Sequence, residues 1–451
     1  MLIPYYLQWL NDEKLIERVV SLFAPPEGGG IEEDTDTAFK VGEQHDNAGQ
    51  LLVEIIRSCR DSQLMAQPAE KFLNPLLATA ESEETVSTLL GHMLDGPPVE
   101  TCLINGVEVL QALLEVRRPQ PQGGGFYAYS SEQDTANCQS DIERQEAVVA
   151  STVQCLLPRL PQLTSLLVSP PHKPPVPTTA GLLQVPVGRS RLALTKLIAS
   201  LLNTNSPSLS KALAEANTLT VLLDLFFEYR LNNFLHAQVA SCLHSVIYWS
   251  EGRQESQAEK TPDTTEVGET SLETPKISEA GETEEEESQH PLEAESFDNP
   301  ALVHLLTSAN LLDRLITAWT SPLQPSVSYM GHVTKISNDL VTACGTSITT
   351  ATAAQPPPTC HSRTLLLQLL AKLPEETTQT WAGIVEGKLT ETNKINEIKP
   401  ADEKRTLSSD DEDSDFTDIN FPGDTVLEKV GPLTLYRLSR QNQPDQTFLR
   451  Y

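Results

Sequence analysis

Leucine-rich segments with helical periodicity recur along most of this chain, and they constrain its fold more than any other feature. In residues 7–23 the charged side chains lie outside a single apolar stripe of Leu7, Leu10, Leu15, Val19 and Leu22. The same signature predicts helices at 47–65, 82–94, 98–116, 141–168, 189–203, 207–229, 232–249, 299–319, 328–344, 361–372 and 375–393. Strand alternation is nearly absent, so the sequence predicts an all-α protein.

Short breaks between leucine-rich helices are typical of helix pairs stacked as an armadillo- or HEAT-like solenoid. Ser82 precedes one helix, which the prolines after Gly96 end, and Asn205-Ser206-Pro207 closes one helix and opens the next. No fixed repeat length emerges. We therefore predict an irregular solenoid, with a non-repeating helical bundle as the alternative.

Four stretches interrupt the helices. Residues 24–46 and 117–137 contain glycine runs and are predicted to be loops. The proline-rich stretch 169–187 predicts an extended connector along the helical surface, because the apolar side chains of Leu182, Leu183 and Val185 are expected to pack against the helices. We expect a helical-repeat region at 1–249, a disordered acidic linker at 250–297, a continuation of the repeats at 298–396 and a disordered acidic tail at 397–451.

The charge of the chain disfavours nucleic acid and membrane surfaces as partners. The formal net charge is −30, and residues 251–300 hold 16 acidic and 3 basic side chains. Seven scattered cysteines without a Cys-x-x-Cys pair fit a reducing compartment. Neither a signal peptide nor an apolar run of spanning length is expected. We expect a cytoplasmic protein, with the nucleus as a second compartment that the sequence leaves open.

Motifs that carry catalysis are not found in the sequence. The glycine runs lack the lysine of a phosphate-binding loop, and no nucleophile-elbow or zinc-protease motif occurs. Cys242 and His244 lie near His236, but positions 242 and 244 face different sides of a helix, so we interpret them as a buried thiol and surface or capping histidines. We interpret His332 as a helix-start or packing residue. The sequence therefore predicts no catalytic residue, cofactor or metal.

One motif is suited to modification. Ser408 and Ser409 are followed directly by a run of Asp and Glu, which is the pattern that acidophilic kinases recognise. Phosphate would add about −1.5 to −2 charge to each serine. We predict Ser408 and Ser409 as phosphorylation sites, with a plain solvated acidic tail as the alternative.

Ordered sequence blocks resemble the SAPS domain of the regulatory subunits of protein phosphatase 6. The blocks are 74–79 (NPLLAT), 81–86 (ESEETV), 93–95 (MLD), 109–118 (VLQALLEVRR), 186–188 (PVG) with 191–192 (RL), 198–205 (IASLLNTN), 217–219 (NTL), 223–227 (LDLFF), 232–239 (NNFLHAQV), 329–336 (YMGHVTKI), 373–376 (LPEE), 389–393 (LTETN) and 408–412 (SSDDE). They extend over about residues 7–420.

This resemblance implies a non-catalytic scaffold that binds a metallophosphatase catalytic subunit, helps to select its substrates and joins an ankyrin-repeat third subunit. Polar residues inside the matched blocks are candidate contacts, namely Asn232, Asn233, His236 and His332, with structural capping as the alternative. A general helical-repeat adaptor unrelated to phosphatases is the first rival function, and an enzyme with an unrecognised site is the second.

Both ends of the chain depart from the family pattern. Family members carry a long helical segment before the block that resembles residues 7–20, so we expect part of the N-terminal solenoid to be absent and an apolar helix face to be uncovered. Residues 431–451 do not resemble the family's continuation, and we expect a divergent C-terminus there.

Overall fold

The computed structural model of the chain describes residues 3–24, 35–65, 72–118, 132–178, 181–249, 299–321, 328–345 and 362–396. The first of the two units of the chain comprises Met1–Asn396. The described residues all belong to the first unit. The predicted linker at 250–297 and the predicted tail with Ser408 and Ser409 lie outside them.

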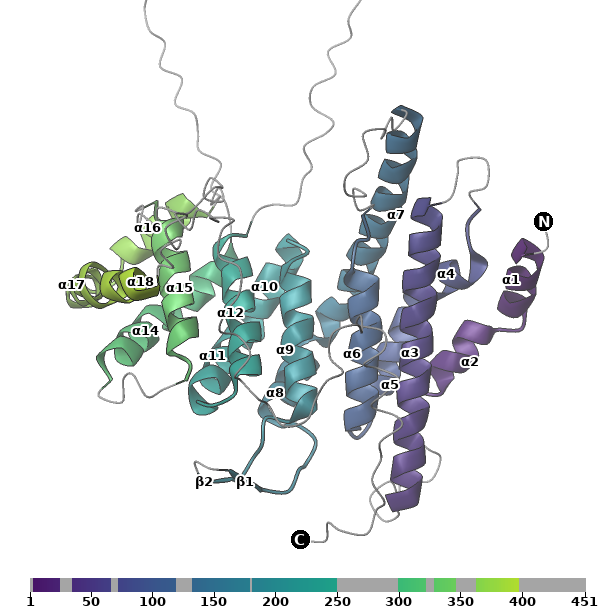
Figure 1. Cartoon of the computed structure of the whole chain (residues 1–451), viewed down its shortest axis with the longest axis horizontal. Helices are drawn as coiled ribbons and strands as arrows, with labels where there is room; N and C mark the ends of the chain where they lie inside the picture. The colour runs from purple at the N-terminus through teal and green to yellow at the C-terminus, as the bar shows by residue number, and fades with distance from the viewer. Residues whose placement is uncertain are drawn as a thin grey trace, which may run out of the picture. The chain divides into compact units, whose positions relative to one another are not determined.

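The first unit is an all-α helical solenoid with one small β-hairpin (Figure 1). Its helices are α1 (Ile3–Asp12), α2 (Leu15–Ser21), α3 (Thr35–Met65), α4 (Pro75–Ala80), α5 (Glu83–Leu94), α6 (Glu100–Leu114), α7 (Glu132–Leu156), α8 (Leu160–Val168), α9 (Gly188–Leu202), α10 (Pro207–Glu215), α11 (Thr218–Glu228), α12 (Asn233–Ile247), α13 (Pro300–Thr307), α14 (Leu311–Thr320), α15 (Met330–Ala343), α16 (Arg363–Ala371), α17 (Glu375–Ile384) and α18 (Thr390–Asn396). A 3-10 turn, η2 (Leu157–Arg159), joins α7 to α8, and a π-helical turn, η3 (Val385–Leu389), joins α17 to α18. Strands β1 (Val176–Thr178) and β2 (Gly181–Leu183) pair antiparallel, with Pro177 opposite Leu182.

Helices three apart in the chain lie side by side. α3, α6, α9, α12 and α15 contact one another in that order and form one row of upright helices in Figure 1. Helices three apart also contact one another in the series α10, α13 and α16, and in the pairs α8 with α11 and α14 with α17. The predicted armadillo- or HEAT-like solenoid is therefore confirmed. The expected helix pair is wrong as the repeating unit, because short helices such as α10 add a third member.

The apolar stripes seen in the sequence form the core between the rows. In α9 the stripe includes Leu194 and Leu197, and in α12 it includes Leu235 and Leu243, all of them fully buried. Full burial of one such side chain contributes about 1.5–3 kcal/mol relative to exposure. Because each row packs against the next, the core is one continuous cluster along the unit.

Several helices begin where the sequence predicts. The hydroxyl of Ser82 accepts the N–H of Thr85 at 3.2 Å at the start of α5, and Pro207 occupies the first turn of α10. The acidic pair Glu83-Glu84 lies in the first turn of α5, where the helix dipole favours negative charge. These signals are local, which explains why the sequence reveals them.

Asparagines split two helices that the sequence predicts to be continuous. Residues 207–229 form α10 and α11, and residues 299–319 form α13 and α14. The breaks occur at Asn217 and Asn310, whose φ angles of 55° and 50° are left-handed. Asparagine tolerates this conformation better than most residues, so the hydrophobic period continues while the helix does not.

Two predicted loops and the connector also differ from the structure. α3 begins at Thr35 inside the predicted loop 24–46, and α7 begins at Glu132 inside 117–137, because the first turns of both helices are polar and show no apolar stripe. Residues 176–183 form the hairpin rather than a plain connector. Leu182 and Val185, expected to be covered, are largely exposed.

Two buried arginines hold the ends of neighbouring helices. Arg60 of α3 donates to the carbonyls of Ala112 (2.9 Å) and Leu113 (3.2 Å) at the end of α6 and to Glu81 Oε1 at 2.7 Å. Arg191 of α9 donates to the carbonyl of Leu167 at 2.8 Å, at the end of α8. The last carbonyls of a helix lack partners within it, so each guanidinium caps a helix end while it joins two helices.

Replacing Arg60 tests this role. We expect Arg60→Met to lower the free energy of unfolding by about 3–5 kcal/mol, because the buried Oε1 of Glu81 and the α6 carbonyls lose the donor that Arg60 provides. Arg57→Met on the same helix is the matched control, since Arg57 makes a partly exposed ion pair with Glu115, and we expect it to cost less than about 1 kcal/mol. Urea unfolding followed by circular dichroism measures both changes. Equal losses would contradict the assignment.

Candidate partner-binding surface

The four candidate contact residues meet at one corner of the solenoid. Asn232 and Asn233 open α12, His236 lies one turn further on, and His332 lies in the first turn of α15. Because α12 and α15 are neighbours in one row, the rings of His236 and His332 approach to 5.8 Å between centroids. His332 lies 96 positions after His236 in the sequence, and the fold brings it beside the other three residues.

Asn232 has a structural role in this corner. Its side-chain oxygen accepts the N–H of Leu235 at 3.0 Å, which caps the start of α12. Such a cap contributes about 1 kcal/mol. The cap also fixes the direction in which the chain enters α12, and so it fixes the position of the residues beside it.

His236 belongs to the core. Its side chain is fully buried, and its Nε2–H donates to the carbonyl oxygen of Phe226 at 3.0 Å. The ring packs edge-on against Phe226 and Tyr329, with centroids 4.7 Å and 5.7 Å away. Burial lowers the pKa of His236, against the bond to Phe226, which raises it. The expectation of a surface or capping histidine is wrong here, because Phe226 of α11 and Tyr329 at the start of α15 cover this side chain.

Asn233 and His332 form the outer part of the corner. Nε2 of His332 lies 2.6 Å from the side-chain oxygen of Asn233, which joins α15 to α12. Asn233 is exposed and His332 is half-buried. Burial lowers the pKa of His332, and the nearby charge of Lys335 lowers it further. The helix-start position predicted for His332 is confirmed, and both residues remain candidate contacts.

Exposed apolar residues flank this corner, and sequence reasoning missed them. Phe234 and Leu231 adjoin the cap residue Asn232, and both side chains point largely to solvent. The signal was present in the sequence, since Leu231 precedes the helix and Phe234 lies outside the buried stripe of α12 that contains Leu235 and Val239. Apolar residues off the stripe are the ones available to a partner.

Cys242 and His244 do not form a reactive pair. Cys242 is fully buried, and burial raises the pKa of its thiol to about 12. Nδ1 of His244 instead lies 3.1 Å from a carboxylate oxygen of Asp339 on α15. The predicted buried thiol and surface histidine are confirmed for these two residues, and the thiol is not activated as a nucleophile.

Within the described ranges, no three His, Cys, Asp or Glu side chains lie close enough to hold a metal ion. Two shallow hollows, of about 170 and 230 Å³, lie beside Arg144 and beside Met93. Small-molecule sites usually measure roughly 300–1,000 Å³. None of the described helices combines the length and the hydrophobicity needed to span a bilayer.

Comparison with known proteins identifies the family. The sequence model of the SAPS family, described as SIT4 phosphatase-associated protein, matches residues 5–212 and 208–398. The chain belongs to the SAPS family. The matched segments cover the described helices of the solenoid almost completely, including the corner formed by α11, α12 and α15.

Several regulatory subunits of serine/threonine-protein phosphatase 6 are similar to this chain. Subunit 1 from Mus musculus is 31% identical over 94% of the chain, subunit 2 from Homo sapiens is 32% identical over 94%, and subunit 3-A from Xenopus laevis is 32% identical over 94%. The chain spans 43%, 39% and 43% of these relatives, respectively, which is less than half of each. No solved structure matches the chain.

The buried histidines predict how stability depends on pH. Because the folded pKa of His236 lies below its unfolded value of 6.5, the unfolded chain binds more protons as the pH falls below 6.5. Stability is therefore fully present above that pH and decreases as the pH falls through the folded pKa. His45 and His304, whose pKa values burial also lowers, add to the same trend.

We expect His236→Gln to flatten part of this pH dependence, whatever its effect on absolute stability. The measurement is the free energy of unfolding from urea titrations between pH 7.5 and pH 5.5, in the wild-type chain and the variant. An identical slope in both proteins would show that His236 is not a neutral, buried group.

Proposed function

We propose that this chain is a non-catalytic regulatory subunit that binds a protein serine/threonine phosphatase catalytic subunit of the phosphatase 6 type and directs its choice of substrate. The observation that carries this proposal is the family match along the whole described solenoid. The names of the relatives, which are regulatory subunits of phosphatase 6, support it further.

The architecture supports the same role. A solenoid presents a long, rigid surface to a partner, because each repeat fixes its neighbours. The acidic segments of a chain with net charge −30 would attract basic substrates toward the bound phosphatase. In this mechanism the chain positions the enzyme and the substrate, and the catalytic subunit supplies the chemistry.

Three further parts belong to the proposal. An ankyrin-repeat third subunit joins the complex, an acidophilic kinase phosphorylates Ser408 and Ser409, and the protein acts in the cytoplasm and the nucleus. The acidic sequence after Ser409 supports the kinase assignment.

The proposal is tested by binding between the purified chain and a purified phosphatase 6 catalytic subunit. We expect saturable binding, with the human regulatory subunit 2 as the positive control. We also expect the chain alone to leave a phosphate ester unhydrolysed, and the bound catalytic subunit to hydrolyse it. If the control subunit binds and this chain does not, or if the chain alone is active, the proposal is wrong.

A further inference from the structure

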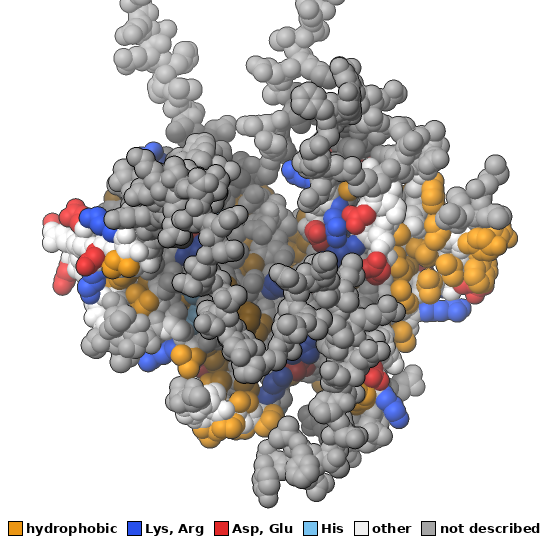
Figure 2. Space-filling view, in the orientation of Figure 1, with side chains coloured by type: hydrophobic (Ala, Val, Ile, Leu, Met, Phe, Trp, Pro, Cys, Tyr) orange, Lys and Arg blue, Asp and Glu red, His pale blue; other side chains and the backbone are white. Residues whose placement is uncertain are grey.

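Four exposed apolar side chains from separate parts of the chain lie around one buried hydrogen-bonded pair. They are Val168 at the end of α8, Val185 after β2, Leu231 between α11 and α12, and Phe234 in the first turn of α12, and they are 58%, 51%, 61% and 79% exposed. We call these four residues the Val168–Phe234 patch. Figure 2 shows hydrophobic side chains gathered on the lower part of the unit, in the region of the hairpin.

The buried pair Arg191–Tyr229 assembles the patch. Arg191 donates to the carbonyl of Val168 at 3.0 Å and to the hydroxyl of Tyr229 at 2.7 Å. That hydroxyl donates to the carbonyl of Val185 at 2.8 Å. The backbone of two patch residues is thus fixed by one polar pair, and Leu231 follows Tyr229 by two positions.

Further contacts make the patch rigid. Asn232 caps α12 between Leu231 and Phe234, and the hydroxyl of Ser328 donates to the carbonyl of Arg230. A preorganised apolar surface loses little conformational entropy on binding, so its area is converted into affinity more efficiently. The patch therefore has the properties of a binding surface rather than of scattered exposed residues.

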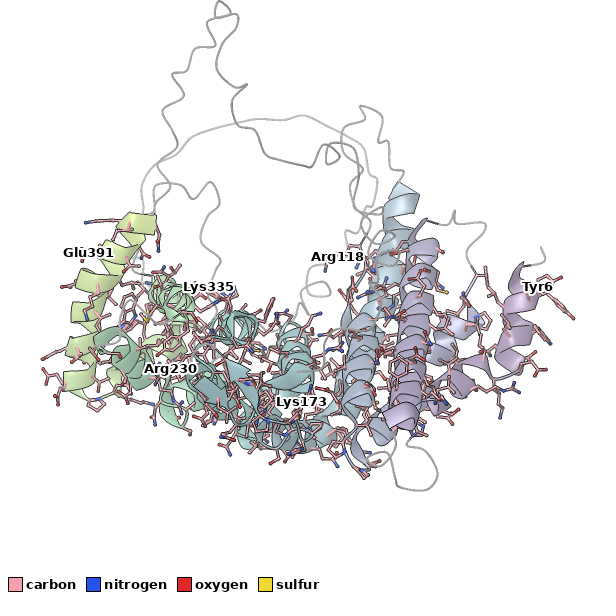
Figure 3. The ribbon with its side chains drawn as sticks, turned by 60° about the horizontal axis from the view of Figure 1, so that its bottom comes forward. Tyr6, Arg118, Lys173, Arg230, Lys335 and Glu391 are labelled. Atoms are coloured by element: carbon pink, nitrogen blue, oxygen red, sulfur yellow. The ribbon has the colours of Figure 1, made fainter. Side chains whose placement is uncertain are left out.

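The rim of the patch is mainly positive. Arg230 adjoins Leu231 in the sequence. Lys335 lies near His332, whose ring contacts Asn233, the residue before Phe234. Both cations are exposed, and Figure 3 labels them on the same part of the unit. Glu228, which precedes Tyr229, is an exposed acidic residue on this rim. In a chain of net charge −30, two exposed cations beside an apolar centre favour a partner surface with acidic residues around an apolar centre.

The patch also depends on both parts of the family match. Val168 and Val185 lie in the first matched segment, whereas Leu231, Phe234 and Lys335 lie in the second, so the surface exists only where the two segments pack together. The family is described as phosphatase-associated, and the patch is built from both matched segments of that family. A phosphatase is therefore the partner that we assign to this patch.

We propose that the Val168–Phe234 patch, with Arg230 and Lys335 on its rim, is the contact surface for the phosphatase catalytic subunit. This inference rests on the proposed function and adds the location. Phe234 enters an apolar hollow of the catalytic subunit, and Arg230 and Lys335 face acidic side chains around that hollow. The Asn233–His332 pair supplies polar contacts at the edge.

Phe234→Ser tests the apolar centre, with Phe39→Ser as the matched control because Phe39 is also an exposed phenylalanine (66%) but lies on α3. Titration of the full chain against a phosphatase 6 catalytic subunit should show a dissociation constant raised about tenfold or more for Phe234→Ser and unchanged for Phe39→Ser. Arg230→Glu combined with Lys335→Glu should slow association and reduce its dependence on salt.

The outcomes separate the location from the function. If the wild-type chain and both phenylalanine variants bind equally, the location is wrong and the proposed function stands. If the wild-type chain does not bind where the human subunit 2 does, the function and the location fail together. Analytical ultracentrifugation of the chain alone tests whether a second copy of the chain occupies the patch. A dimer that Phe234→Ser dissociates would overturn the proposal.

Discussion

Buried guanidinium groups at helix ends are the interaction on which the described solenoid depends. Leucine stripes supply most of the favourable free energy, but they are nearly interchangeable between repeats and do not fix one helix against another in a unique register. Arg60 and Arg191 do so, because each guanidinium satisfies carbonyls at the end of a neighbouring helix, α6 for Arg60 and α8 for Arg191. A helix end buried without such a donor would be costly.

The same constraint links stability to recognition. At Arg60 the network closes inward on Glu81, which Arg144 also contacts. At Arg191 the network continues outward through Tyr229 to the loop after the hairpin. One buried pair therefore holds the backbone of an exposed apolar surface, so that the surface is rigid although its side chains lie in solvent.

The fold was predictable where the causes are local. Leucine stripes, the cap at Ser82 and the proline of α10 act within a few residues, and the sequence shows them directly. The helix breaks at Asn217 and Asn310 escaped prediction because the apolar period continues across them. The repeat of three helices escaped because it depends on which helices pack together, and hydrophobic spacing alone does not specify that.

The candidate site was predictable in part for the same reason. Asn232, Asn233, His236 and His332 were singled out from matched blocks, and the fold brings them together. Their different roles follow from burial, which no single sequence reveals: His236 is core, whereas Asn233 is exposed. Leu231 and Phe234 were overlooked because an apolar residue next to a helix start is usually assigned to the core.

Hydrogen–deuterium exchange of the chain with and without a phosphatase 6 catalytic subunit tests the central claim most directly. The account predicts added protection in residues 168–187 and 228–236, around the Arg191–Tyr229 pair, and unchanged exchange in α1 and α3. Protection confined to other helices, or none at saturating catalytic subunit, would contradict it.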